Sequence, residues 1–123
     1  REFKGYYSHI LPAVEKAKEK YPDIEFKSRF SGPMETLPNF YEEIMVSIIA
    51  SDTDAGPSMF GESSLMDIPC ISTNIGIPRD VIQNGINGFI VEKDINLIAE
   101  KIIELYENRE LLKSMSKRIR KDY

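Results

Sequence analysis

The segment Asp54–Glu62 holds the residues that are best suited to bind an anionic ligand. It reads DAGPSMFGE and connects an apolar run, IMVSIIA, to a stretch of helical character. Where a loop enters a helix, unpaired backbone N–H groups and the partial positive charge of the helix N-terminus stabilise a phosphate. We therefore expect Ser58, Met59 and Phe60 to supply amides to such a ligand.

A second chemical feature of this segment is the carboxylate of Glu62, which stands four residues beyond Ser58. A carboxylate accepts two hydrogen bonds at once, so it suits the vicinal hydroxyls of a ribose. A purely structural interpretation is equally open. In that interpretation Asp54 and Ser58 order the loop, and Glu62 offsets the helix dipole.

The elements around this segment are predicted from hydrophobic periodicity. Segments typical of strands are residues 24–30, 44–50, 69–73 and 88–92. Helices are expected over residues 6–21, 38–43, 60–66, 78–83, 95–106 and 111–119. Pro12 should kink the first helix or define its true first turn, and Asp94 can cap the fifth.

This alternation of helices and apolar strands predicts the fold class. It favours an α/β, Rossmann-like three-layer domain with a mainly parallel sheet of about four strands and helices on both faces. Ligands bind such sheets at the carboxyl ends of the strands. The loops after Ala50 and Thr73 are therefore where chemistry is expected.

Composition limits the class of protein. The chain has 123 residues, 41% hydrophobic and 29% charged, which suits a single domain over residues 1–123. A net charge of -4 argues against nucleic-acid binding, because such domains usually carry a basic face. Cys70 lies in an apolar run and His9 has no second ligand at metal-binding spacing, so we expect no disulfide, metal or cofactor. With no apolar span or signal peptide, the expected location is cytoplasmic.

Several motifs follow one another in a characteristic order over residues 56–94, which read GPSMFGESSLMDIPCISTNIGIPRDVIQNGINGFIVEKD. The order resembles the C-terminal domain of GT-B-fold retaining glycosyltransferases of the group 1, family 4 type, which carry an E-x7-E carboxylate pair. Residues 62–69 stand where that family has its EAMACGxP helix. The resemblance covers about residues 38–115. It implies a donor-binding C-terminal domain of a larger enzyme whose N-terminal acceptor domain is absent.

The resemblance implies roles for individual residues. Glu62 matches the second carboxylate, which contacts the ribose, and Asp54 stands where the first carboxylate, a glutamate, approaches the donor sugar. Aspartate is one methylene shorter, which puts the first carboxylate's role in doubt. Asp54 and Glu62 are thus the candidate catalytic residues. The candidate substrate-binding residues are Arg1, Lys4, Gly32, Met34, Gly56, Ser58, Met59, Phe60 and Ser63.

Two groups among these candidates are matched outside the central motif. Arg1 and Lys4 resemble the family's basic pair, whose charge would neutralise the donor diphosphate. Lysines at a helix start are also commonly just solvated. Gly32 and Met34 lie in SGPM, where the chain is shorter than its relatives, and would face the nucleotide base. An ordinary glycine–proline turn is the alternative.

The activity implied by the resemblance is transfer of a glycosyl group from a nucleotide-diphosphate sugar, with retention, to a glycan or lipid-linked acceptor in glycan or polysaccharide biosynthesis. This chain alone would be inactive. The alternative is a non-catalytic nucleotide-sugar-binding or interaction module derived from a glycosyltransferase, which Asp54 in place of glutamate favours. A receiver-like or general nucleotide-binding domain is the weakest option, because the sequence has no acidic phosphoacceptor cluster or P-loop.

The end of the chain carries a basic cluster on an otherwise acidic protein. Its members are Lys113, Lys117, Arg118, Arg120 and Lys121. A solvated helix face accounts for such a cluster. The alternative is peripheral contact with an anionic membrane, at its inner face, which would suit a lipid-linked acceptor.

Overall fold

The computed structural model describes residues 6–25, 46–50 and 58–123. The predicted helix over 38–43 and most of the predicted strand over 24–30 lie outside these ranges. Within them, strands β1 (Ser47–Ile49), β2 (Cys70–Thr73) and β3 (Gly88–Val91) form one sheet in the order β1-β2-β3. Both pairings are parallel. The described residues therefore confirm a parallel sheet and contain three of the four predicted strands.

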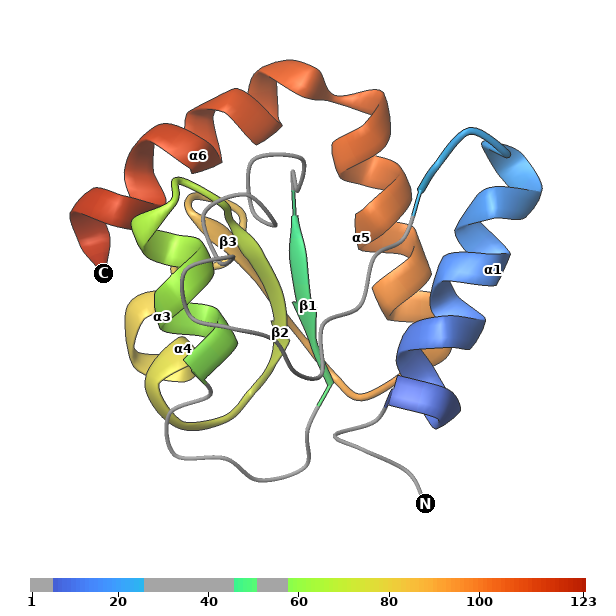
Figure 1. The fold of residues 1–123 in the computed structure, drawn as a ribbon, viewed down its shortest axis with the longest axis horizontal. Helices are drawn as coiled ribbons and strands as arrows, with labels where there is room; N and C mark the ends of the chain where they lie inside the picture. The colour runs from blue at the N-terminus through green and yellow to red at the C-terminus, as the bar shows by residue number, and fades with distance from the viewer. Residues whose placement is uncertain (1–5, 26–45, 51–57) are drawn as a thin grey trace, which may run out of the picture.

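Helices flank this sheet on both sides. They are a π-helical turn (Tyr6–Ile10), α1 (Leu11–Lys20), α3 (Ser58–Leu65), α4 (Gly76–Val81), α5 (Ile95–Glu107) and α6 (Arg109–Asp122). Figure 1 shows α1 and α5 on one side of the sheet and α3 and α4 on the other, with α6 crossing from the end of α5 towards α3. The predicted Rossmann-like three-layer architecture is confirmed.

Local sequence signals explain where several helices begin. Pro12 lies in the first turn of α1, directly after the π-helical turn, where its missing N–H costs least. The side chain of Asp94 caps α5 by accepting a hydrogen bond from the Leu97 amide at 3.0 Å. Asn108 alone separates α5 from α6, and its Oδ1 accepts from the Leu111 amide at 3.0 Å. The Asp94 cap was predicted and the Asn108 cap was not.

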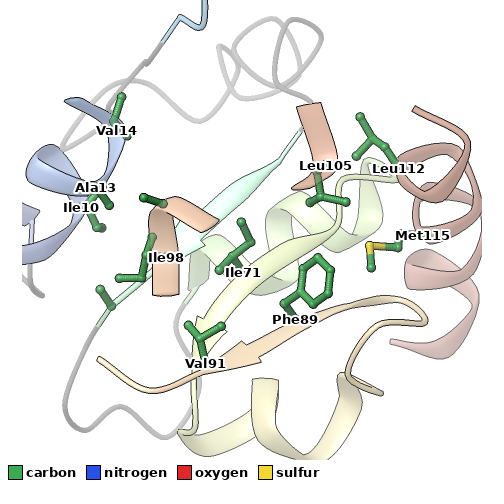
Figure 2. Packing of buried hydrophobic residues seen from close by; sticks show 12 residues of the cluster. Ile10, Ala13, Val14, Ile71, Phe89, Val91, Ile98, Leu105, Leu112 and Met115 are labelled. Carbon is green, nitrogen blue, oxygen red and sulfur yellow. The ribbon is translucent and has the colours of Figure 1, made fainter. Parts of the chain in front are cut away.

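The core consists of two clusters on opposite faces of the sheet. On β2, Ile71 packs in the cluster with α1 and α5, while Cys70 packs in the cluster with α3. Figure 2 shows Ile71 among the buried residues of the first cluster. Helix α6 contributes Met115 to the first cluster and Ile119 to the second, so it ties the two together. β1 likewise contributes Ile48 to the first cluster and Ile49 to the second, which explains why residues 44–50 read as a nearly continuous apolar run.

Helix α3 ends with a residue in the left-handed backbone conformation, and the type of that residue is unusual. The Ile68 amide donates to the Ser63 carbonyl at 2.9 Å, and the Asp67 amide donates to the Ser64 carbonyl at 3.2 Å. This pattern is a Schellman motif, whose left-handed residue is usually glycine. Here it is Asp67, with a φ of 62°. The chain therefore holds a strained residue at the turn that leads from α3 into β2.

Candidate functional site

An open pocket of about 390 Å³ lies at the carboxyl ends of β2 and β3. It is lined by Thr73, Asn74, Ile75, Ile90, Val91, Glu92 and Lys93. The sequence pointed to the loop after Thr73 as a place for chemistry, and the pocket lies there. The sequence analysis did not predict that Glu92 and Lys93, directly after Val91, belong to a site. A charged pair that follows an apolar strand can indicate such a position. The pocket thus occupies the edge where ligands bind in this class of sheet.

The lining of this pocket combines apolar and hydrogen-bonding groups. Ile75 and Val91 are buried and form an apolar base. Asn74 and Glu92 are exposed and offer an amide and a carboxylate. Small-molecule sites typically have a few polar groups on an apolar wall and volumes of about 300–1,000 Å³. The pocket therefore places an amide and a carboxylate beside apolar side chains.

The start of α3 presents backbone donors at the same edge of the sheet. β1 ends at Ile49, and α3 begins at Ser58, two residues before the predicted start. The first turn of α3 contains no acidic residue. Its amide dipoles are therefore not offset by a carboxylate within that turn. This is the electrostatic setting that the sequence predicted for an anion, and the role of these amides stays a prediction.

Glu62 is the fifth residue of α3, just beyond the amides of the first turn. Its side chain is half-buried and already takes part in an interaction within the chain. Glu62 does not line the pocket at β2 and β3. A ligand that reached both places would have to extend along the carboxyl edge of the sheet.

Phe60 and Gly61 are packed against the end of the chain. The Phe60 ring is 1% exposed and meets the Tyr123 ring edge-on, with centroids 5.5 Å apart. At Gly61, a Cβ would lie 2.6 Å from the Tyr123 hydroxyl oxygen. The Phe60 side chain therefore belongs to the core, and only its backbone is suited to the predicted contact with a ligand.

Ser63 is fully buried and faces the sheet. Its Oγ lies 3.1 Å from the Oγ of Ser47 on β1 and donates to the Phe60 carbonyl at 3.3 Å. The hydroxyl thus joins α3 to the strand that precedes the predicted ligand loop. In this conformation the Ser63 hydroxyl contributes to a ligand site by holding α3 against β1.

The remaining predicted site residues lie outside the described part of the chain. They are Arg1, Lys4, Gly32, Met34, Asp54 and Gly56. Ser58 and Met59 are described only as part of the α3 backbone. Their proposed contacts stay predictions.

The Cys70 thiol and the possible metal ligands are two further chemical features of the chain. Burial raises the pKa of the Cys70 thiol to about 12, so the thiolate form is scarce at neutral pH and the residue is a core side chain. Among the described residues, no three His, Cys, Asp or Glu side chains group closely enough to hold a metal ion. The expectation that no metal takes part stays untested.

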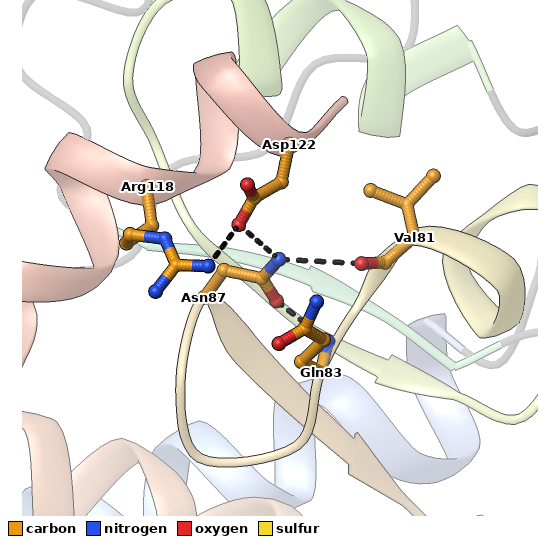
Figure 3. Close-up of polar contacts among 5 residues, drawn as sticks. All are labelled: Val81, Gln83, Asn87, Arg118 and Asp122. Carbon is orange, nitrogen blue, oxygen red and sulfur yellow. Dashed lines mark hydrogen bonds and ion pairs between the residues drawn. The ribbon is translucent and has the colours of Figure 1, made fainter.

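A buried polar cluster behind the site was missed from the sequence. Asn87 is fully buried, and its Oδ1 accepts from the Gln83 amide at 2.7 Å. Its Nδ2 donates to the Val81 carbonyl at 3.2 Å and to Asp122 Oδ2 at 3.0 Å (Figure 3). Asp122 also pairs with Arg118 at 3.2 Å. One amide thus connects the end of α4, the turn before β3 and the end of α6.

The comparisons of this chain with a family model and with known proteins agree on one family. The family model "Glycosyl transferases group 1" matches residues 9–122. A capsular polysaccharide biosynthesis glycosyltransferase, CapM of Staphylococcus aureus, is 30% identical over 101 residues, which cover 81% of this chain and 26% of CapM. N-acetyl-alpha-D-glucosaminyl L-malate synthase of Bacillus anthracis is 26% identical over 98 residues, covering 79% of this chain and 26% of that enzyme. The chain matches about a quarter of the length of each of these relatives.

Solved structures share the fold. A variant of S. aureus TarM, in complex with fondaparinux, alpha-GlcNAc-glycerol and UDP, superposes with a TM-score of 0.82 at 19% identity, over 98% of this chain and 30% of TarM. The C-terminal domain of the group 1 glycosyl transferase LpcC from Francisella tularensis gives a TM-score of 0.82 at 20% identity, over 99% of this chain and 78% of that domain. At these identities the likeness concerns the fold.

Proposed function

The chain belongs to the group 1 glycosyl transferases, and from this premise we propose that it holds the nucleotide-diphosphate sugar of a retaining glycosyl transfer reaction. The observation that carries the proposal is the arrangement at the carboxyl end of β1. Helix α3 begins at this edge with Ser58, has no acid in its first turn, and carries Glu62 immediately after it. Amide donors and a carboxylate in this order suit a diphosphate and a ribose on one ligand.

Each group has a distinct task in this proposal. The amides of Ser58, Met59 and Phe60 stabilise the negative charge that develops on the departing diphosphate. Glu62 accepts hydrogen bonds from the ribose hydroxyls. Asp54 orients the donor sugar, next to Gly56 in the same loop.

Groups elsewhere in the chain complete the donor site in this proposal. Arg1 and Lys4 add positive charge beside the diphosphate, and Gly32 and Met34 lie on the side of the base. No metal or cofactor is required, because amides and basic side chains carry the charge of the leaving group.

The acceptor belongs to the rest of the enzyme in this proposal. GT-B glycosyltransferases close two domains around their substrates, and this chain corresponds to the donor-binding one. We expect the chain alone to bind the donor without transferring sugar. We propose a glycan or lipid-linked acceptor; the glycan is supported by CapM, whose name refers to capsular polysaccharide biosynthesis.

The experiment is a titration of the 15N-labelled chain with UDP and with GDP, followed by backbone amide shifts. We expect the amides of residues 58–63 to move first and furthest, because the diphosphate meets the start of α3. Amides of α5, on the other side of the sheet, serve as the internal reference. Shifts confined to α5, or none at millimolar nucleotide, would refute the proposed donor site.

A second function is favoured by one observation, the aspartate at position 54. The chain would then be a nucleotide-sugar-binding or interaction module without catalysis. Asp54→Glu in the longest available form of the protein separates the two. A large gain of transfer activity indicates a lapsed catalyst, and a loss indicates a site adapted to aspartate.

A further inference from the structure

Helix α6 is strongly basic on a chain that is acidic overall. Its sequence RELLKSMSKRIRKD holds six basic and two acidic residues, whereas the whole chain has a net charge of -4. The apolar stripe of α6, with Leu112, Met115 and Ile119, is buried in the core. The basic side chains beyond its first turn are exposed: Lys113, Lys117, Arg118, Arg120 and Lys121. The packing of α6 therefore uses its apolar stripe and leaves these charges at the surface.

The two acids of α6 do little to offset this charge. Asp122 accepts a hydrogen bond from buried Asn87 and lies 3.2 Å from Arg118, so it offsets the charge of Arg118 alone (Figure 3). Glu110 lies in the first turn, where a carboxylate complements the helix dipole. Lys113, Lys117, Arg120 and Lys121 are left as a positive face.

Exposed apolar side chains accompany this face at the amino edge of the sheet. Leu65 and Met66, before β2, are 55% and 38% exposed, and Ile86, before β3, is 44% exposed. Both turns lie at one edge, because Cys70 pairs in parallel with Gly88. α6 crosses this edge and bonds to Asn87, the residue next to Ile86 (Figure 1). Asp67, beside Met66, is also exposed.

We propose that this basic and apolar face docks on an anionic lipid surface. Lysines and arginines are attracted to acidic headgroups, and apolar tips such as Leu65 and Met66 reach the boundary between headgroups and acyl chains. A soluble acidic partner would pair with the basic side chains but would leave the Leu65 and Met66 side chains exposed to water. No helix in the described part of the chain is long and apolar enough to cross a bilayer.

The test measures co-sedimentation of the chain with vesicles of phosphatidylcholine and phosphatidylglycerol, against vesicles of phosphatidylcholine alone. We expect binding only to the anionic vesicles. The double variant Lys117→Gln, Lys121→Gln should bind about 30-fold more weakly, at about 1 kcal/mol for each charge. The matched control, Lys16→Gln with Lys18→Gln on α1, removes the same charge elsewhere and should bind as the unaltered chain does.

A second pair of variants distinguishes lipid from other anions. Leu65→Ser with Met66→Ser should weaken vesicle binding and leave binding to heparin, a soluble polyanion, unchanged. Equal binding to both vesicle types, an equal loss in the α1 control, or no effect of the serine substitutions would each overturn the proposal. The measurement contains no nucleotide, so its failure is independent of the proposed function.

Discussion

Ser63 on α3 and Ser47 on β1 face each other inside the core, with their hydroxyl oxygens 3.1 Å apart. Both side chains are buried, Ser63 fully and Ser47 at 5% exposure. The pair joins β1, the strand that precedes Asp54 in the sequence, to α3, the helix that carries Glu62. The position of the proposed donor site thus depends on a polar contact between α3 and β1.

Ser63→Ala should lower the free energy of unfolding by about 1–2 kcal/mol, because it takes a partner from the buried Ser47 hydroxyl. Denaturant unfolding measures the change. The double variant Ser47→Ala, Ser63→Ala should cost less than the sum of the two single changes, since it leaves no unpaired hydroxyl. Strict additivity would mean that the two hydroxyls do not interact.

Asp67→Gly should raise the free energy of unfolding by about 1 kcal/mol, because glycine adopts the left-handed conformation of the Schellman motif without strain. The matched control is Asp80→Gly in α4, a helical residue where glycine should destabilise by about 0.3 kcal/mol, the difference between the helix propensities of aspartate and glycine. Thermal and denaturant unfolding both measure these shifts. A destabilised Asp67→Gly chain would show that the aspartate side chain stabilises this turn.

Asn87→Ala should lower the free energy of unfolding by about 3 kcal/mol, because it leaves the Gln83 amide and the Val81 carbonyl without their side-chain partner. Asn84→Ala is the control, since the exposed Asn84 side chain accepts a single bond, from the Ile90 amide at 3.0 Å. That change should cost less than about 1 kcal/mol. Similar losses in the two variants would contradict the assigned importance of the buried amide.

Glu107 should make the stability of the chain depend on pH in the acid range. Hydrogen bonds from Tyr21 and then Lys20, whose Nζ lies 2.9 Å from Oε2, hold the pKa of Glu107 below its usual 4.5. A carboxylate whose pKa is lower in the folded chain than in the unfolded chain stabilises the fold at pH values above its unfolded pKa. That stabilisation is lost as the pH falls through its folded pKa. The Tm of the unaltered chain should therefore exceed that of Glu107→Gln at neutral pH, and the gap should close below pH 4.5. A gap that stays constant into acid would contradict this account.

Much of the fold could be predicted because its signals are local. The Asp94 cap and the strands at Cys70–Thr73 and Gly88–Val91 are visible in short windows of sequence, and the structure confirms them. Asn87 could not be assigned in the same way. In the sequence NGING it looks like an ordinary turn residue, and its burial depends on α6, which lies 35 positions away at Asp122.

The candidate site was predicted in part for a similar reason. The carboxyl edge of a parallel sheet follows from topology, and the pocket does lie after Thr73. Whether a side chain there faces a ligand or the core depends on packing between layers. Ser63, predicted to contact substrate, faces Ser47 across that packing, and its contact with a ligand stays a prediction.

The most direct test of the donor-site account is the affinity of the chain for UDP and GDP, measured by calorimetry for the unaltered chain, Glu62→Gln and Glu100→Gln. Glu100 is an exposed carboxylate on α5, on the other side of the sheet, so it controls for the loss of one charge. We expect Glu62→Gln to weaken the better-binding nucleotide at least about tenfold, since a charge-assisted hydrogen bond contributes about 1.5–3 kcal/mol. Glu100→Gln should bind as the unaltered chain does. Equal affinity in all three proteins would contradict the assignment of Glu62 to the ribose.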